Sequence, residues 1–228
     1  MNAGVGPLST LQLAMRFLYE DPGPWERLRA LRKLVPNIPF QAIVRGANGV
    51  GYTSYLDNAI YDFSTKAVEN GLDIFRVFDS LNYFENMKLG IDAAKKAGGV
   101  CEAVVCYTGD VGSLNEEKYT LQYYLDFVDL SLDQLVKEGI HVLGVKDIAG
   151  LLKPEAARIL IGAIRKAHPD LHIHVHSHDT AGIATAGHYL VLSSCLLCRL
   201  KLREWSRTSR RGITYRNTAH RHSRNRRW

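Results

Sequence analysis

A regular alternation of short apolar segments and longer amphipathic segments runs through residues 38–187 and restricts the fold more than any other feature. Five apolar segments of strand length follow one another at intervals of about 30–40 residues, the spacing that parallel strand–helix–strand units require. We predict that these five strands lie at residues 39–44, 73–78, 101–107, 141–145 and 172–176.

Two of the intervening segments, residues 116–138 and 154–166, carry apolar residues at helical spacing. The second begins with Pro154, and proline favours the first turn of a helix. The apolar stripes consist of Leu121, Tyr124, Leu125, Val128, Leu132 and Leu135 in the first segment and of Ala157, Leu160, Ile161 and Ile164 in the second. We therefore expect two amphipathic helices that pack on a sheet.

Polar and turn-forming residues gather at one end of the predicted strands, as in Arg45-Gly-Ala-Asn, Phe78-Asp-Ser-Leu-Asn and Lys146-Asp-Ile-Ala-Gly. Functional residues at the carboxyl ends of successive strands are typical of (β/α)8 barrels, and no dinucleotide-binding fingerprint follows an early strand. We therefore predict an α/β fold of the TIM-barrel type rather than a doubly wound sheet. Five predicted strands make this a partial (β/α)8 barrel.

Lys146, His176 and His178 come to one edge of the sheet if the strands pair in this order. Alternate residues of a strand point to the same face, so His176 and His178 share a face while Lys146 ends the neighbouring strand. Two imidazoles so placed are typical of a metal site. An isolated His-x-His segment is more often a half-exposed strand face without a metal, and that alternative stays open at this stage.

Basic residues are concentrated at the carboxyl end of the chain. Residues 188–228 contain 11 of the 29 lysines and arginines but only one of the 23 acidic residues, which gives this segment a net charge of +10. The remaining residues, 1–187, contain 18 basic and 22 acidic residues and have a net charge of −4. The segment loses the earlier periodicity, and we expect it to be disordered. It could bind nucleic acid or an acidic partner, yet a shifted reading frame or read-through would give the same composition. We favour the latter and do not expect nucleic acid as a partner.

Composition excludes several other classes. The four cysteines are too few and too unevenly placed for a disulfide framework, which indicates a reducing compartment. The longest apolar run, residues 189–198, is half as long as the ~20-residue segment that crosses a bilayer. No targeting signal is visible, so we expect neither secretion nor a membrane span.

Six blocks together identify a family. They read Phe17-Leu-Tyr-Glu-Asp-Pro, Pro36-Asn-Ile-Pro-Phe-Gln, Arg45-Gly-Ala-Asn-Gly-Val-Gly-Tyr, Phe75-Arg-Val-Phe-Asp-Ser-Leu-Asn, Lys146-Asp-Ile-Ala-Gly-Leu-Leu-Lys-Pro and His174-Val-His-Ser-His-Asp-Thr. In order and spacing they resemble the carboxyltransferase domain of the pyruvate carboxylases over residues 10–187. Residues 1–9 and 188–228 match nothing in that domain.

The resemblance implies a barrel that transfers a carboxyl group from carboxybiotin to pyruvate and forms oxaloacetate, a ligase step of pyruvate metabolism and gluconeogenesis. It implies that Lys146 is N6-carboxylated and binds Zn or Mn together with His176 and His178. Arg45 matches the arginine that contacts pyruvate and stabilises its enolate. Tyr52 matches a residue beside the biotin ring, and Asp79 matches an acid that lines the pocket.

The resemblance also implies partners: biotin from a carrier domain, a biotin carboxylase domain, and a homotetramer in the mitochondrial matrix or the cytoplasm. An Arg-Asp-Ala-His-Gln motif, whose Asp completes the metal site, does not precede Thr10, and the proton-relaying Thr does not follow Gly187. We therefore expect this chain to be inactive by itself. Five strands with two open edges also predict poor solubility.

Other interpretations remain open at this stage. The chain could be a non-enzymatic truncated or frameshifted product. Metal-dependent lyases and acyltransferases of the same fold also end a strand in His-x-His, but they lack the lysine that Lys146 matches. Oxaloacetate decarboxylases usually carry Gln where Ala47 stands. Without the family, Arg45, Tyr52 and Asp79 could each be ordinary strand-end or loop residues.

Overall fold

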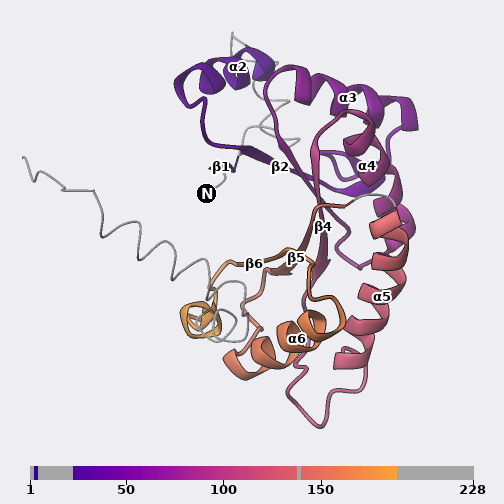
Figure 1. The fold of residues 1–228 in the computed structure, drawn as a ribbon, viewed down its shortest axis with the longest axis vertical. Helices are drawn as coiled ribbons and strands as arrows, with labels where there is room; N and C mark the ends of the chain where they lie inside the picture. The colour runs from indigo at the N-terminus through magenta and orange to yellow at the C-terminus, as the bar shows by residue number, and fades with distance from the viewer. Residues whose placement is uncertain (1–2, 5–22, 138–139, 189–228) are drawn as a thin grey trace, which may run out of the picture.

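The computed structural model describes residues 3–4, 23–137 and 140–188, and within them a single parallel sheet of six strands in sequential order, β1-β2-β3-β4-β5-β6 (Figure 1). The sheet curves so that its concave face opens between β1 and β6. The strands are β1 (Ala3–Gly4), β2 (Phe40–Val44), β3 (Ile74–Phe78), β4 (Val100–Cys106), β5 (Val142–Asp147) and β6 (Ile173–Ser177).

Among the described residues, the helices labelled in Figure 1 all lie on the convex face of this sheet. They are α2 (Pro24–Leu34), α3 (Asp57–Glu69), α4 (Phe84–Lys96), α5 (Leu121–Lys137) and α6 (Pro154–Ala167), with a 3-10 turn η2 (Gly46–Asn48) after β2. A doubly wound sheet would carry helices on both faces. The sequential order and the one-sided helices are those of a partial (β/α)8 barrel, so the predicted fold class is confirmed.

The five predicted strands all form, with boundaries within two residues of those expected from the sequence. The main shift is in β5, which continues to Asp147 and so includes Lys146. The short strand β1 was not predicted. It pairs Ala3 with Phe40 and Gly4 with Gln41, within the segment 1–9 that matched no family block.

Helix α5 was predicted to begin at residue 116, but it begins at Leu121. The carboxylate of Glu116 accepts hydrogen bonds from the backbone amides of Asp110 at 3.0 Å and Tyr119 at 3.0 Å, which folds residues 110–119 into a loop. The Thr120 hydroxyl then accepts a hydrogen bond from the Tyr123 amide at 3.2 Å, as an N-cap does. Side-chain capping therefore sets the start of the helix later than the apolar stripe indicates.

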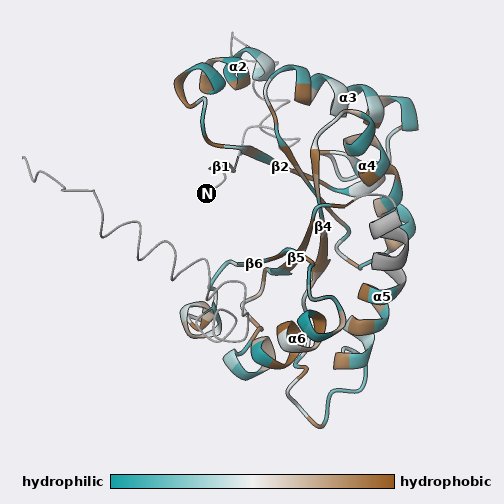
Figure 2. Cartoon of the chain, viewed as in Figure 1, coloured by the Kyte–Doolittle hydropathy of each residue, from teal (hydrophilic) through white to brown (hydrophobic). Residues whose placement is uncertain are grey.

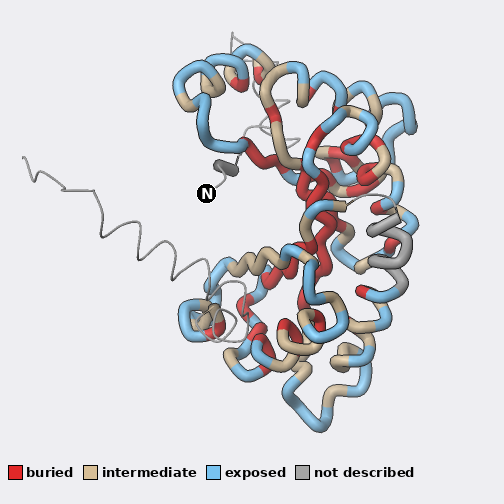
Figure 3. The backbone as a smooth tube through the Cα atoms, in the orientation of Figure 1, coloured by how far each residue is buried: buried red, intermediate tan, exposed pale blue. Residues whose placement is uncertain are grey.

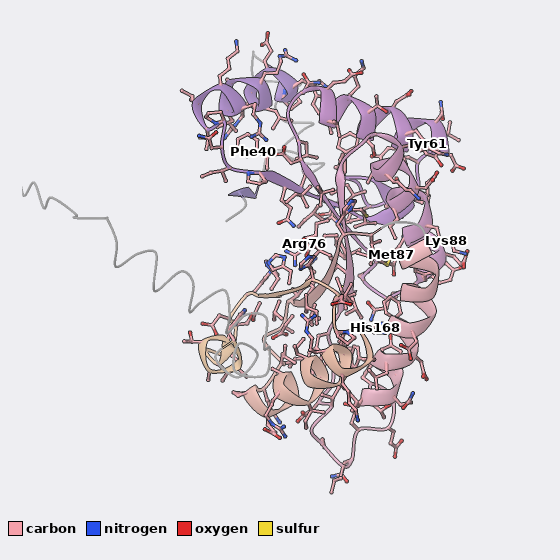
Figure 4. The ribbon with its side chains drawn as sticks, in the orientation of Figure 1. Phe40, Tyr61, Arg76, Met87, Lys88 and His168 are labelled. Carbon is pink, nitrogen blue, oxygen red and sulfur yellow. The ribbon has the colours of Figure 1, made fainter. Side chains whose placement is uncertain are left out.

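The hydrophobic core lies between the sheet and the helices. Alternate strand residues such as Phe75 and Val77 of β3 pack against the helices, and Met87 of α4 is fully buried among them (Figure 4). A second cluster joins β5 to α5 and α6. Figure 2 shows the central strands β4 and β5 as apolar and the helices around them with many hydrophilic residues, and Figure 3 shows burial falling from the central strands to β6, whose residues are all half-buried.

Several sequence-based expectations fall outside the described residues. These are the arginine-rich segment beyond His188, the cysteines Cys195 and Cys198, and the family block that starts at Phe17. In the part of the chain that the structure describes, no helix is long and apolar enough to cross a membrane.

We expect Leu160→Ala to lower the free energy of unfolding of the full chain by about 2–5 kcal/mol, because truncating a buried leucine loses its burial and leaves a cavity. Leu160 of α6 is completely buried in the cluster with β5. The matched control is Leu114→Ala, since Leu114 is fully exposed in the loop before α5. Urea unfolding followed by circular dichroism measures both, and equal midpoints for the two variants would contradict this packing.

Candidate functional site

Lys146 lies in the middle of a row of three residues across adjacent strands. Its Cα is in register with Cys106 on β4 and with His176 on β6. In-register residues of neighbouring strands point to the same face. Lys146 is only 5% exposed, and its Nζ lies 3.4 Å from the centroid of the Phe78 ring, a cation–π contact. The predicted meeting of Lys146 and His176 is therefore present in the structure.

The surroundings of Lys146 disfavour its charge. Burial lowers the pKa of the Lys146 ammonium, and the positive charges of Arg76 and Arg45 lower it further, while Cys106 acts in the opposite direction. Among the described residues, no carboxylate forms an ion pair with its Nζ. A lysine in such a place is more readily the neutral, nucleophilic amine.

His176 and His178 lie side by side at the end of β6. Their ring centroids are 5.0 Å apart and the rings are nearly perpendicular, at 79°. Burial lowers the pKa of His176 to about 4, and Arg76 adds to this effect. His176 is therefore neutral at neutral pH, the form that offers a lone pair to a metal.

Asp147 secures the carboxyl ends of β5 and β6. Its buried carboxylate accepts hydrogen bonds from the amides of Leu151 at 2.8 Å and Leu152 at 3.1 Å and lies 3.4 Å from the Ser177 hydroxyl. The backbone carbonyl of Asp147 accepts a hydrogen bond from the amide of His178 at 3.1 Å. The end of β5, which carries Lys146, is thus joined directly to the segment after β6 that carries His178.

Arg45 and Tyr52 approach the same site from the end of β2. The guanidinium carbon of Arg45 lies 4.6 Å from the centroid of the Tyr52 ring and 5.9 Å from that of Phe78. The next residue, Gly46, has φ +50°, and a Cβ there would collide with the carbonyl of Asn86, so only glycine fits the turn. The Phe78 ring is therefore shared by the cations of Arg45 and Lys146.

Asp79 is occupied within its own loop. Its carboxylate accepts hydrogen bonds from the amides of Leu81 at 2.8 Å and Tyr83 at 3.0 Å and from the Asn86 side chain at 2.8 Å. These contacts shape the turn from β3 into α4. The structure thus gives Asp79 a part in loop formation, and its expected place in a substrate pocket stays a prediction.

Sequence reasoning missed a polar cluster one layer deeper, centred on Glu102 of β4. Glu102 is 2% exposed, and its Oε1 lies 3.2 Å from Arg76 Nε on β3 and 2.9 Å from His174 Nδ1 on β6. Its Oε2 accepts a hydrogen bond from the Gln41 side chain of β2. Figure 4 shows Arg76 on the concave side of the sheet. Single charged residues within apolar strands were the available signal.

Arg76 is incompletely satisfied in this cluster. Its Nε is at ion-pair distance from Glu102, but neither Nε nor Nη2 has a hydrogen-bond partner among the described residues. Burial lowers the pKa of Arg76, and Glu102 offsets part of that effect. We therefore regard the pair as charge compensation in a low-dielectric interior.

The described histidines, cysteines, aspartates and glutamates include no group of three or more arranged to hold a metal. The pair His176 and His178 would need a third ligand from another residue type. A carbamate on Lys146 would supply an anionic oxygen in the row next to His176, whereas a bare ammonium would repel a cation. The donor set fits a divalent metal only if Lys146 is carboxylated.

Comparison with known proteins gives a consistent result, although no protein-family model matches the chain. The chain is 57% identical over 178 residues to pyruvate carboxylase 1 of Caenorhabditis elegans and 59% identical over 179 residues to pyruvate carboxylase of Schizosaccharomyces pombe. Mitochondrial pyruvate carboxylase of Homo sapiens is 54% identical over 178 residues. Each alignment covers 78% of this chain but only 14–15% of the relative.

Comparison with solved structures points to the same proteins as the sequence comparison. The carboxyltransferase domain of Rhizobium etli pyruvate carboxylase with pyruvate matches with a TM-score of 0.74 and 45% identity, over 84% of this chain and 31% of that chain. The same domain with pyruvate and biocytin matches with a TM-score of 0.74 and 44% identity, over 82% of this chain and 31% of that chain.

We expect Lys146→Met to raise the free energy of unfolding of the metal-free full chain, because methionine fills a similar volume without a buried ammonium that lacks a carboxylate partner. Lys33→Met is the control, since Lys33 is exposed on α2 and its replacement should leave the unfolding midpoint unchanged. Urea unfolding measures both. A lower midpoint for Lys146→Met than for Lys33→Met would show that the lysine is stabilising in its site.

Proposed function

The chain belongs to the pyruvate carboxylase family, whose members are biotin-dependent carboxylases, and we propose that its residues 10–187 form part of a carboxyltransferase site acting on pyruvate. The observation that carries the proposal is the buried Lys146, set between Cys106 and His176 in the strand register, with its pKa lowered and without a carboxylate partner among the described residues. The activity is stated as a proposal rather than a finding, because the chain spans only about 15% of the length of these relatives.

Lys146 is suited to carry a carbamate. A neutral amine adds to carbon dioxide to form an N-carboxylate and releases one proton, and the lowered pKa of Lys146 raises the fraction of neutral amine. The product is an anion, which Arg76 and Arg45 would stabilise because both act on Lys146 electrostatically. With His176 and His178, the carbamate would complete three ligands for Zn²⁺ or Mn²⁺. When bound, such a metal supplies Lewis acidity toward the pyruvate carbonyl.

Arg45 and Tyr52 would bind the reacting molecules. The guanidinium of Arg45 offers charge-assisted hydrogen bonds to the carboxylate of pyruvate and to the enolate oxygen, where negative charge develops. Tyr52 is 77% exposed beside Arg45, so its ring is available to lie against biotin. We retain Asp79 in the proposal only as a residue that lines the pocket while holding its loop.

The overall transfer conserves atoms and charge. The carbon–nitrogen bond of carboxybiotin breaks, a carbon–carbon bond forms at the methyl carbon of pyruvate, and the methyl proton passes to the biotin nitrogen to give biotin and oxaloacetate. Carboxybiotin would come from carrier and carboxylase domains, in a homotetramer in the mitochondrial matrix or the cytoplasm. Lys146 separates this proposal from acyl-CoA lyases of the same fold, which lack that lysine.

A carbamate test addresses the central claim. Full-length chain incubated with ¹³C-bicarbonate and Zn²⁺ should show a carbamate carbon resonance and should bind Zn²⁺ in calorimetry. Lys146→Met should abolish the resonance and weaken metal binding, while Lys33→Met should retain both. A chain that shows neither the carbamate signal nor metal binding would overturn the proposal.

A ligand test addresses Arg45. We expect Arg45→Lys to weaken pyruvate binding by about 10-fold or more, because a point charge replaces the bidentate guanidinium. Arg158→Lys is the control, since Arg158 lies on the exposed face of α6 and pairs with Glu155. Titration with pyruvate followed by NMR measures the dissociation constants. Equal affinities for the two variants would remove Arg45 from the substrate site.

A further inference from the structure

The deeper polar cluster contains a contact between strands that are not neighbours. Glu102 lies on β4 and His174 on β6, with β5 between them, yet Glu102 Oε1 and His174 Nδ1 are 2.9 Å apart. Adjacent strands are about 4.8 Å apart, so this contact spans about 9.6 Å of sheet. Only two long side chains that extend toward each other over the intervening strand can close that distance.

Gly144 of β5 leaves the space through which the Glu102 side chain reaches His174. It is in register with His174, and a Cβ at this position would lie 2.5 Å from Glu102 Oε1 and 2.7 Å from Val104 Cγ2. The Glu102 carboxylate therefore rests over bare backbone. Glycine within a strand weakens it and often marks the close approach of another group, and here that group is the carboxylate.

The contact suits one tautomer of His174. A carboxylate oxygen accepts a hydrogen bond from a histidine that carries its proton on Nδ1, and we assign this tautomer to His174 in the proposal below. A carboxylate behind one ring nitrogen is the arrangement that orients histidines in metal sites. His174 lies two residues before His176 on the same face of β6.

Strand β6 is held in place by few other contacts, so a contact from Glu102 to His174 would help to fix its position. All its residues are only half-buried, and in the part of the sheet that the structure describes it pairs with β5 alone. Its backbone register thus depends on one neighbour, with Asp147 joining the loops at the carboxyl end. The contact from Glu102 adds a connection to a strand that is itself buried on both sides.

We propose that Glu102 is a positioning residue for β6: its carboxylate crosses β5 over Gly144, holds His174, and thereby places His176 and His178 beside Lys146. The inference rests on the proposed metal site, because correct placement of these groups matters for ligand geometry. A competing role for Glu102 is charge compensation of Arg76 alone, without any part in placing β6.

Three changes on the full chain separate these roles. Glu102→Asp keeps a negative charge beside Arg76 but is one methylene too short to cross β5. Gly144→Ala keeps every charge and obstructs the path. Gly162→Ala is the matched control, because a Cβ at Gly162 of α6 has no atom within 4 Å. His174→Asn keeps a donor near the position of Nδ1, whereas His174→Ala removes it.

Calorimetry with Zn²⁺ in the presence of bicarbonate gives the first readout. We expect Glu102→Asp, Gly144→Ala and His174→Ala to weaken Zn²⁺ binding by about 10- to 100-fold, as loss of a group that orients a ligand does. Gly162→Ala and His174→Asn should bind like the unmodified chain. The proposal is overturned if Glu102→Asp and Gly144→Ala bind normally, or if His174→Asn loses as much affinity as His174→Ala, which would make His174 a ligand.

Long-range ¹H–¹⁵N NMR gives a readout that does not need the metal. The unmodified chain should hold His174 in the Nδ1–H tautomer, and Glu102→Asp should shift it toward the Nε2–H form and lower hydrogen-exchange protection of the β6 amides. If the unmodified chain shows neither Zn²⁺ binding nor the carbamate signal, the proposed function fails, and this readout alone then decides whether Glu102 holds His174. If Glu102→Asp and Gly144→Ala do not fold, the comparison of His174→Asn with His174→Ala decides whether the contact between Glu102 and His174 positions β6. An unchanged tautomer and unchanged protection would contradict it.

Discussion

Among the described residues, the concave face of the sheet contains more buried positive charge than its buried carboxylate can neutralise, and the arrangement of the site follows from this imbalance. Arg76 and Lys146 are both buried there, and Arg45 acts on Lys146 electrostatically. Glu102 pairs with Arg76, while the other acid that is buried in the described part of the chain, Asp147, follows Lys146 on the opposite face of β5 and accepts hydrogen bonds from backbone amides. Because a low-dielectric interior penalises uncompensated charge, the pKa values of Lys146 and Arg76 fall and an added anion would be stabilised.

The side chains on the concave face of the sheet form two layers with different roles. In the deeper layer, Glu102 joins Arg76, Gln41 and His174 from three other strands into one connected group. In the layer toward the carboxyl edge, Phe78 lies between the cations of Arg45 and Lys146 and gives each a weak attraction that does not neutralise them. The deeper layer therefore fixes the strands, and the outer layer keeps its amine and imidazoles available for chemistry.

Local pattern was enough to predict the strands and the meeting of Lys146 with His176. Short apolar segments at the spacing of strand–helix–strand units, with turn residues at one end, indicate the strands, and parallel pairing of β5 with β6 then puts the two residues side by side. The predicted start of α5 was wrong because the Glu116 carboxylate accepts hydrogen bonds from backbone amides of the preceding loop, which keeps these residues out of the helix. The two-residue strand β1 has no periodic signal. The partners of Asp79 depend on how its loop closes, which spacing does not reveal.

The contact between Glu102 and His174 was beyond sequence reasoning for a different reason. It joins strands separated by another strand, so neither the pattern of β4 nor that of β6 specifies it, and its local traces are a charged residue within an apolar strand, Glu102, and Gly144 on the strand between. A Cβ at residue 144 would collide with the Glu102 carboxylate, so the contact with His174 requires a glycine at this position. The absence of a side chain on β5 is therefore what allows a residue of β4 to reach β6 and, in our proposal, to place the histidines.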